Sequence, residues 1–260
     1  MPEPTVACVM LTKDRAQMAA RAVEGFRRQT YERKELVIWD TTEPWIYIAT
    51  GKMERHVHGS HPEETIGQQR NSANEWAVEM ARGLPAPPDI LCHFDDDDWS
   101  HPNRLAEQVA LLQASGADCV GYNQMLFWDQ NAGLMRLESG VLRSHRADEP
   151  VGEAWLYTGE ILGTSLCYWR RTWERKPFRT DVKRGEDLHF VAGLSVKAVS
   201  SIPDGPRPGW PLSCRDDFGE SPRMIAGIHG GNTGDHIAPG KQEWKRALEW
   251  DSYCRETMKL

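Results

Sequence analysis

The sequence predicts an α/β protein with a mixed, mostly parallel central sheet flanked by helices. Apolar runs at residues 5–11, 35–40 and 90–94 lack polar alternation, as expected for strands that are covered on both faces. Segments with helical periodicity separate these runs, at residues 16–28 and 66–82. A strand–helix–strand order of this kind favours parallel pairing through right-handed crossovers.

The first strand, the first helix and the second strand are the clearest elements. Thr12 to Arg15 interrupts the opening apolar run and ends the strand. The second strand ends in an acid, Asp40. The helix between them is indicated by apolar residues that recur at helical spacing, which are Met18, Ala22, Val23 and Phe26.

Residues 41–65 have no clear periodicity, and residues 45–48 are compatible with either a strand or an apolar loop. Three histidines, His56, His58 and His61, lie close together in this stretch. A tetrahedral zinc site needs a fourth ligand, and no soft ligand is near them. We therefore interpret the histidines as part of a polar loop.

The third strand leads directly into four consecutive aspartates, Asp95 to Asp98. Adjacent carboxylates repel one another unless a cation or hydrogen-bond donors offset them. A solvated acidic surface is the simpler interpretation, but ligands of open α/β sheets bind at the carboxyl ends of strands. Hard oxygen ligands at that point suit Mg²⁺ or Mn²⁺. A helix at 104–115 follows, and Gly116 ends it.

The second half of the chain is less periodic. We expect one bent strand or two short ones at 118–129, followed by loops and short strands at 130–160. Residues 161–169 form a further apolar run, and the remaining expected elements are a helix at 187–196, a loop-rich stretch at 200–222, a short strand at 224–229 and a terminal helix at 240–257.

The composition bounds the class of protein. With 260 residues, of which 40% are hydrophobic and 27% charged, the chain suits one large globular domain or two small ones. We expect no transmembrane segment and no signal peptide, because no apolar run has the required length or position. The net charge of −7 argues against a strong general attraction to nucleic acid or anionic lipid. The six cysteines form no CxxC pair, which favours buried thiols in a reducing, cytoplasmic setting.

Six motifs in order resemble those of the family-2 glycosyltransferases, which are inverting enzymes with a GT-A (Rossmann-like) fold and nucleotide-sugar donors. The resemblance extends from residue 5 to about residue 236. Two positions depart from the family pattern: Leu11 replaces the usual proline or serine, and Thr41 replaces a second acid after Asp40. The motifs are Val6 to Arg15, Arg28 to Asp40, Gly67 to Ala73, Phe94 to Leu105, the pair Gly163–Ser165 and Gly185–Asp187, and Ile228 to Thr233.

The resemblance implies one continuous domain, with a nucleotide-sugar-binding half at 1–105 and an acceptor-binding half at 106–260 that includes the C-terminal helix. It also implies a bound Mn²⁺ or Mg²⁺ and, by default, a UDP-sugar donor. The implied metal site consists of Asp97 as direct ligand, Asp95 through water or on the ribose, and His229, which is otherwise a buried structural histidine.

The remaining donor contacts follow from the same resemblance. Thr12 and Asp40 would hold the base and ribose, and Asp96 completes the acid-x-acid site. Arg70 would face a phosphate or the nucleobase, although a helix-surface arginine is nearly as good an interpretation. Asp98 either orients its neighbours or is only an acid at a helix start.

Inversion in one step needs a base on the acceptor side, opposite the leaving diphosphate. On the resemblance Asp187 is that base and Glu186 the alternative, while a helix-start acid without a chemical role is the plain interpretation.

Two other functions stay open. A nucleotidyltransferase on a similar fold would want a glycine-rich phosphate loop, which 11–15 lacks. A non-catalytic nucleotide- or glycan-binding relic would bind without turnover.

The acceptor is not identified by the motifs, but charge offers one indication. The stretch from Arg170 to Arg184 contains seven basic residues against two acidic ones, a local charge of +5 that leads into Glu186. It is either a solvated loop or a surface that attracts an anionic acceptor. Such an acceptor would be an acidic or phosphorylated glycan, a lipid phosphate or a modified nucleic acid.

Overall fold

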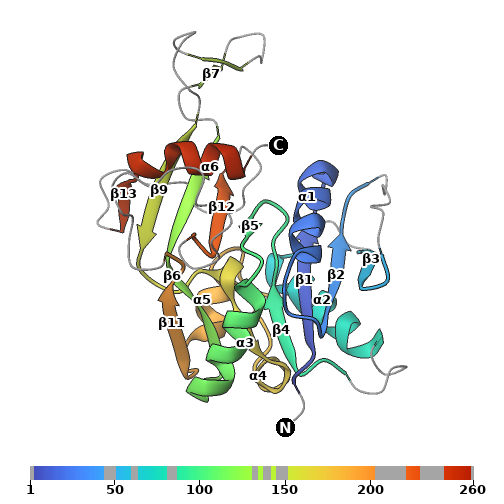
Figure 1. Ribbon diagram of the computed structural model, residues 1–260. Helices are drawn as coiled ribbons and strands as arrows, with labels where there is room; N and C mark the ends of the chain where they lie inside the picture. The colour runs from blue at the N-terminus through green and yellow to red at the C-terminus, as the bar shows by residue number, and fades with distance from the viewer. Residues whose placement is uncertain are drawn as a thin grey trace.

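A computed structural model describes residues 3–43, 51–59, 64–80, 87–130, 134–136, 142–144, 152–202, 221–228 and 243–258 (Figure 1). The strands are β1 (Val6–Thr12), β2 (Lys34–Asp40), β3 (Glu54–His58), β4 (Ile90–His93), β5 (Trp99–Ser100), β6 (Cys119–Asp129), β7 (Leu134–Arg136), β8 (Leu142–Ser144), β9 (Glu153–Thr158), β10 (Cys167–Trp169), β11 (Val196–Ser200), β12 (Met224–Ile228) and β13 (Trp244–Arg246). The helices are α1 (Ala16–Arg27), α2 (Ile66–Met80), α3 (Arg104–Ser115), α4 (Arg170–Arg175), α5 (Glu186–Val191) and α6 (Asp251–Thr257), with 3₁₀ turns at Gly163–Ser165 and Leu248–Trp250.

Strand β1 lies in the parallel part of the sheet. It pairs in parallel with β2 on one side and with β4 on the other, and β3 continues the parallel order beyond β2. All seven residues of β1 are buried, which confirms the prediction of a strand covered on both faces. Its alternate residues serve two cores, because Cys8 packs with α1 and α3 while Ala7 packs with α2.

The rest of the sheet is mixed, so the predicted α/β class is confirmed. Strand β10 runs antiparallel between β4 and β6, and β6 then pairs in parallel with β11 and β12 and antiparallel with β9. The full order is β13-β9-β6-β10-β4-β1-β2-β3, with β5, β11 and β12 paired beside this path and β7–β8 as a separate ribbon.

The pairing of β10 with β4 places the functional loops. Cys167 in β10 lies opposite Cys92 in β4. Because the two strands are antiparallel, the turn Gly163–Ser165 before β10 lies beside the residues that follow β4. These residues are Asp95 to Asp98. Helices α1 and α3 cover one face of the sheet, and α2, α4 and α5 cover the other (Figure 1).

Three predicted elements were wrong. Residues 54–58 form an edge strand rather than a polar loop, because the backbone pairs with β2 although only Val57 is apolar. The helix expected at 187–196 ends at Val191, since Gly193 has φ 77° and the chain then enters β11.

The third wrong element is the helix expected at 240–257, which is confined to 251–257. The antiparallel edge of β9 recruits residues 244–246 as β13. The open alternatives for 45–48 and most of the loop-rich stretch at 200–222 lie outside the described residues. None of the described helices is long and apolar enough to cross a membrane.

A buried arginine joins the sheet to the loops above it. Arg104, in α3, is fully buried and donates to the carbonyl oxygen of His93 at 2.7 Å and to that of Thr164 at 3.2 Å. It also donates to Ser100 Oγ at 2.8 Å and to Gln108 Oε1 at 3.1 Å. One side chain therefore connects the end of β4, β5 and the turn before β10.

We expect Arg104→Met to lower the free energy of unfolding by about 3 kcal/mol, because buried acceptors left without donors cost about 1–3 kcal/mol each. Urea denaturation measures the difference. The matched control is Arg28→Met, an exposed arginine after α1, for which a change within about 0.5 kcal/mol is expected. Equal stability of the two variants would contradict the role of Arg104.

Candidate active site

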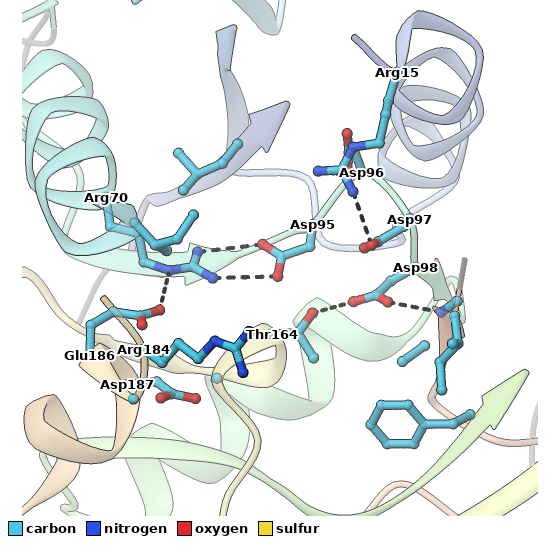
Figure 2. A pocket seen from close by; sticks show the side chains of 18 of the residues that line it. Arg15, Arg70, Asp95, Asp96, Asp97, Asp98, Thr164, Arg184, Glu186 and Asp187 are labelled. Carbon is cyan, nitrogen blue, oxygen red and sulfur yellow. Dashed lines mark hydrogen bonds and ion pairs between the residues drawn. The ribbon is translucent and has the colours of Figure 1, made fainter. Parts of the chain in front are cut away.

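A cavity of about 310 Å³ lies where β1 and β4 end (Figure 2). One wall is formed by Asp95 to Asp98, which follow β4. The facing wall is formed by Lys183 to Asp187, at the start of α5. Two segments about ninety residues apart in the sequence thus place carboxylates on opposite sides of one cavity.

Arg15 holds the middle of the acidic wall. Its guanidinium lies 3.0 Å from Asp96 and 3.2 Å from Asp97. The side chain of Asp96 is 1% exposed and that of Asp97 is 15% exposed, so Asp97 is the more accessible of the two. Burial, reinforced by the neighbouring charge of Asp97, raises the pKa of Asp96 to about 7.

Arg70, in α2, bridges the two walls. It forms two contacts of 3.4 Å with the carboxylate of Asp95 and lies 3.7 Å from Glu186 (Figure 2). Burial is the largest single influence and would raise the pKa of Asp95, but the charges of Arg70 and His93 and the hydrogen bonds from Arg70 and Thr164 together hold that pKa below its usual value. For Glu186 burial outweighs Arg70, and the pKa is raised.

Asp98 fastens the acidic loop to two other segments. The hydroxyl of Thr164 donates to one carboxylate oxygen, and the backbone N–H of Gly227 lies 3.4 Å from the other. Asp98 is buried, and burial, followed by the charges of Asp97 and Asp95, raises its pKa well above the ordinary value. These two contacts hold the Asp98 carboxylate in place.

Asp187 rests directly against the turn before β10. Its Oδ1 accepts a hydrogen bond from the backbone of Leu188 at 2.8 Å. A Cβ atom at Gly163 would overlap the Asp187 carboxylate, so only glycine allows this close approach. The turn and the acid therefore fix each other's position.

We expect Gly163→Ala to lower kcat about tenfold with little change in nucleotide binding, because a displaced carboxylate loses its alignment with the substrate. Steady-state kinetics and nucleotide titration measure the two effects. Gly25→Ala in α1 is the matched control, since a Cβ there meets nothing within 4 Å. Normal turnover of the Gly163 variant would show that Asp187 needs no such support.

Comparisons with known proteins agree with this geometry. The model of the family "Glycosyl transferase family 2" matches residues 7–145, just over half of the chain. The chain belongs to glycosyl transferase family 2. Its resemblance to that family and its identification as a glycosyl-transfer enzyme are therefore confirmed.

Individual relatives are distant. A "putative colanic acid biosynthesis glycosyl transferase WcaA" of Escherichia coli K12 is 22% identical over 210 residues, 75% of this chain and 67% of that protein. The structure of S. aureus TarS 1-349 in complex with UDP-GlcNAc has a TM-score of 0.54 at 11% identity, over 90% of this chain and 62% of that one. A mannosyltransferase from Pyrobaculum calidifontis, solved with GDP-Man and Mn²⁺, has a TM-score of 0.50 at 14% identity, over 80% of this chain and 59% of that one.

These structural neighbours share the fold, and the GT-A expectation is confirmed. The glycosyltransferase chain spans less than two thirds of the length of the solved structures it resembles.

Two of the predicted donor residues of this glycosyltransferase lie just outside the cavity lining. Thr12 and Asp40 are cross-strand neighbours at the ends of β1 and β2. Asp40 is buried, lies 2.9 Å from His56 Nε2 and accepts a 2.9 Å hydrogen bond from the backbone of Thr42. His229 lies outside the described residues, as does His61.

The carboxylate oxygens at the cavity of the glycosyltransferase are ligands that suit a hard divalent cation. The described residues contain no group of three His, Cys, Asp or Glu side chains arranged to hold a metal. Mg²⁺, however, is commonly held by one or two carboxylates together with substrate phosphates and water. Asp97 offers such a carboxylate at the cavity.

The sequence analysis placed Arg15 and Thr164 inside two of the family-like motifs but assigned neither residue a role of its own. Arg15 follows β1, and the parallel pairing of β1 with β4 puts it beside the acids that follow β4. That signal was available in the strand order. The contact of Thr164 with Asp98 depends on β10, whose antiparallel direction no local pattern reveals.

Proposed function

We propose that this glycosyltransferase transfers a sugar from a nucleoside-diphosphate sugar to an acceptor hydroxyl with inversion, by a metal-dependent single displacement. The observation that carries the proposal is the cavity with Asp97 on one wall and Asp187 on the other. A UDP-sugar is the default donor, which agrees with the UDP-GlcNAc bound to the TarS neighbour. The GDP-Man of the other neighbour makes GDP-sugars the second class to test.

The donor would bind in the half formed by residues 1–105 and the acceptor in the half formed by residues 106–260. On this proposal Thr12 and Asp40 hold the base and ribose, and Arg70 contacts the diphosphate or the base. Arg70 is already placed between Asp95 and Glu186, so donor binding and the acceptor-side acids share one positioning residue.

Asp97, with Asp95 through water and His229 as a further ligand, would hold Mn²⁺ or Mg²⁺. When bound, the cation supplies positive charge for the departing diphosphate without a proton transfer. The side chain of Asp97 suits this role because it is exposed to the cavity, whereas Asp96 is buried with a pKa near 7. Arg15 would offset the repulsion between the two neighbouring carboxylates in the absence of donor.

Asp187 would act as the general base. It takes the proton of the acceptor hydroxyl while that oxygen bonds to the anomeric carbon. The bond from this carbon to the diphosphate oxygen breaks, and the nucleoside diphosphate leaves with the electron pair. Glu186 is less suited to this role because Arg70 lies 3.7 Å from its carboxylate. We also propose a cytoplasmic location, which agrees with the buried free thiols of the described cysteines.

A donor screen tests the proposal. Nucleoside diphosphates and nucleotide sugars are added with and without Mn²⁺ in a thermal-shift assay, because a true ligand stabilises the folded state by mass action. Products of the donor that stabilises most are then analysed. Release of a nucleoside diphosphate supports glycosyl transfer, release of pyrophosphate indicates nucleotidyl transfer, and binding without release indicates a non-catalytic protein.

A further inference from the structure

We propose that Lys183 and Arg184 form an anion-binding subsite for the acceptor, so that the accepted hydroxyl belongs to a small glycan-type molecule with one negatively charged group close to it. This inference rests on the proposed glycosyl transfer. It assigns a substrate class to the acceptor side, on which the family membership is silent.

The basic run 170–184 divides by position into residues that lie outside the cavity and two residues that line it. Most of its charges are engaged outside the cavity. Arg175 lies 2.9 Å from Asp118, and Lys176 donates to the carbonyl oxygen of Ala192. The other engaged members are Arg170, 2.8 Å from Glu174, Arg171, over the Trp169 ring, and Arg179, 2.6 Å from Asp181.

Lys183 and Arg184 are the two members of the run that line the cavity. Among the described residues, Lys183 has no hydrogen-bond or ion-pair partner. Figure 2 shows the Arg184 side chain extending from the wall of Glu186 and Asp187 toward Thr164. Both basic residues are exposed, so an incoming molecule can reach them.

The backbone places these cations beside the proposed base. Gly185 has φ 73°, a left-handed conformation that turns the chain between Arg184 and Glu186. Asp187 follows two residues later and lines the same cavity. An anionic group held by Lys183 and Arg184 would therefore belong to the molecule whose hydroxyl faces Asp187.

The charges of the cavity limit the size of that anion. Its lining has six acidic side chains and four basic ones, in a chain with a net charge of −7. Arg15 and Arg70 already contact acids of the cavity. A single phosphate or carboxylate meets a local pair of cations, whereas a long polyanion would also meet the surrounding acids. The balance favours a small anionic glycan over a nucleic acid.

The test compares Lys183→Ala/Arg184→Ala with Arg175→Ala/Lys176→Ala, which removes the same charge outside the cavity. Each protein is saturated with its best-binding nucleoside diphosphate and Mg²⁺. Glucose 6-phosphate, methyl glucuronide and neutral methyl glucoside are then titrated and followed by ligand-observed NMR. The two anions distinguish a phosphate from a carboxylate, and the glucoside measures contacts that do not depend on charge.

We expect at least one anionic probe to bind the parent more tightly than methyl glucoside. Its Kd should rise about tenfold or more in the Lys183/Arg184 variant and stay unchanged in the control. Equal binding of charged and neutral probes to the parent, or equal losses in both variants, would overturn the subsite. A raised Kd for the nucleoside diphosphate with unchanged probe binding would assign the two cations to the donor instead. Failure of the proposed function is distinguishable, since it would appear as absent nucleotide binding or absent diphosphate release in the parent.

Discussion

Asp97→Asn is expected to abolish transfer and to weaken nucleotide binding only when Mn²⁺ or Mg²⁺ is present. Asparagine keeps the size of the side chain but removes the charge that a hard cation requires. Of the four aspartates, Asp97 combines exposure to the cavity with a position between the buried Asp96 and the anchored Asp98.

The measurement is a nucleoside-diphosphate titration with and without EDTA, together with product formation from the donor. Asp181→Asn is the matched control, because this exposed acid pairs with Arg179 away from the cavity. Its binding and turnover should equal those of the parent. Activity that survives both EDTA and the Asp97 substitution would show that the enzyme does not depend on a metal.

Most of the donor wall could be predicted from the sequence because its signals are local. The apolar run of β1, the acids after β4 and the glycine that ends α3 each depend on a few adjacent residues. Gly116 has φ 63°, as a left-handed helix end requires. The edge strands β3 and β13 were missed because they are held by backbone pairing to a neighbouring strand, which leaves no apolar pattern in their own residues.

The burial of Arg70 could have been predicted from the sequence. It precedes Ala73 by three residues and Ala77 by seven, so helical spacing puts it on the face that packs against the sheet. A helix-surface arginine was therefore the less suitable interpretation, and Arg70 is buried. Its contact with Glu186 could not be predicted, because 116 positions separate the two residues and only the folded sheet brings them together.

The basic run illustrates the opposite limit. The sequence of residues 170–184 has a net positive charge, but a count of charges treats all seven basic residues alike. Arg175 and Lys176 lie outside the cavity, where the carboxylate of Asp118 pairs with Arg175 and the backbone carbonyl oxygen of Ala192 accepts a hydrogen bond from Lys176. The charge that matters for a ligand is the charge that faces it, and this depends on tertiary structure.

The acceptor-side acids make the second large prediction. Asp187→Asn should lower the transfer rate by about 10² or more and leave nucleotide binding intact, because the amide cannot take the acceptor proton. Glu186→Gln is the comparison, since it changes the adjacent acid in the same way.

The two variants should differ for a structural reason. Glu186 lies 3.7 Å from the buried Arg70, which also contacts Asp95 on the donor wall. Removing its charge is therefore expected to disturb nucleotide binding more than the chemical step. Asp187 contacts the Gly163 turn instead, so removing the charge of Asp187 should leave nucleotide binding unchanged. Single-turnover rates and nucleotide titrations of both variants separate these effects. Near-normal turnover of Asp187→Asn, together with a 10²-fold loss in Glu186→Gln, would make Glu186 the base.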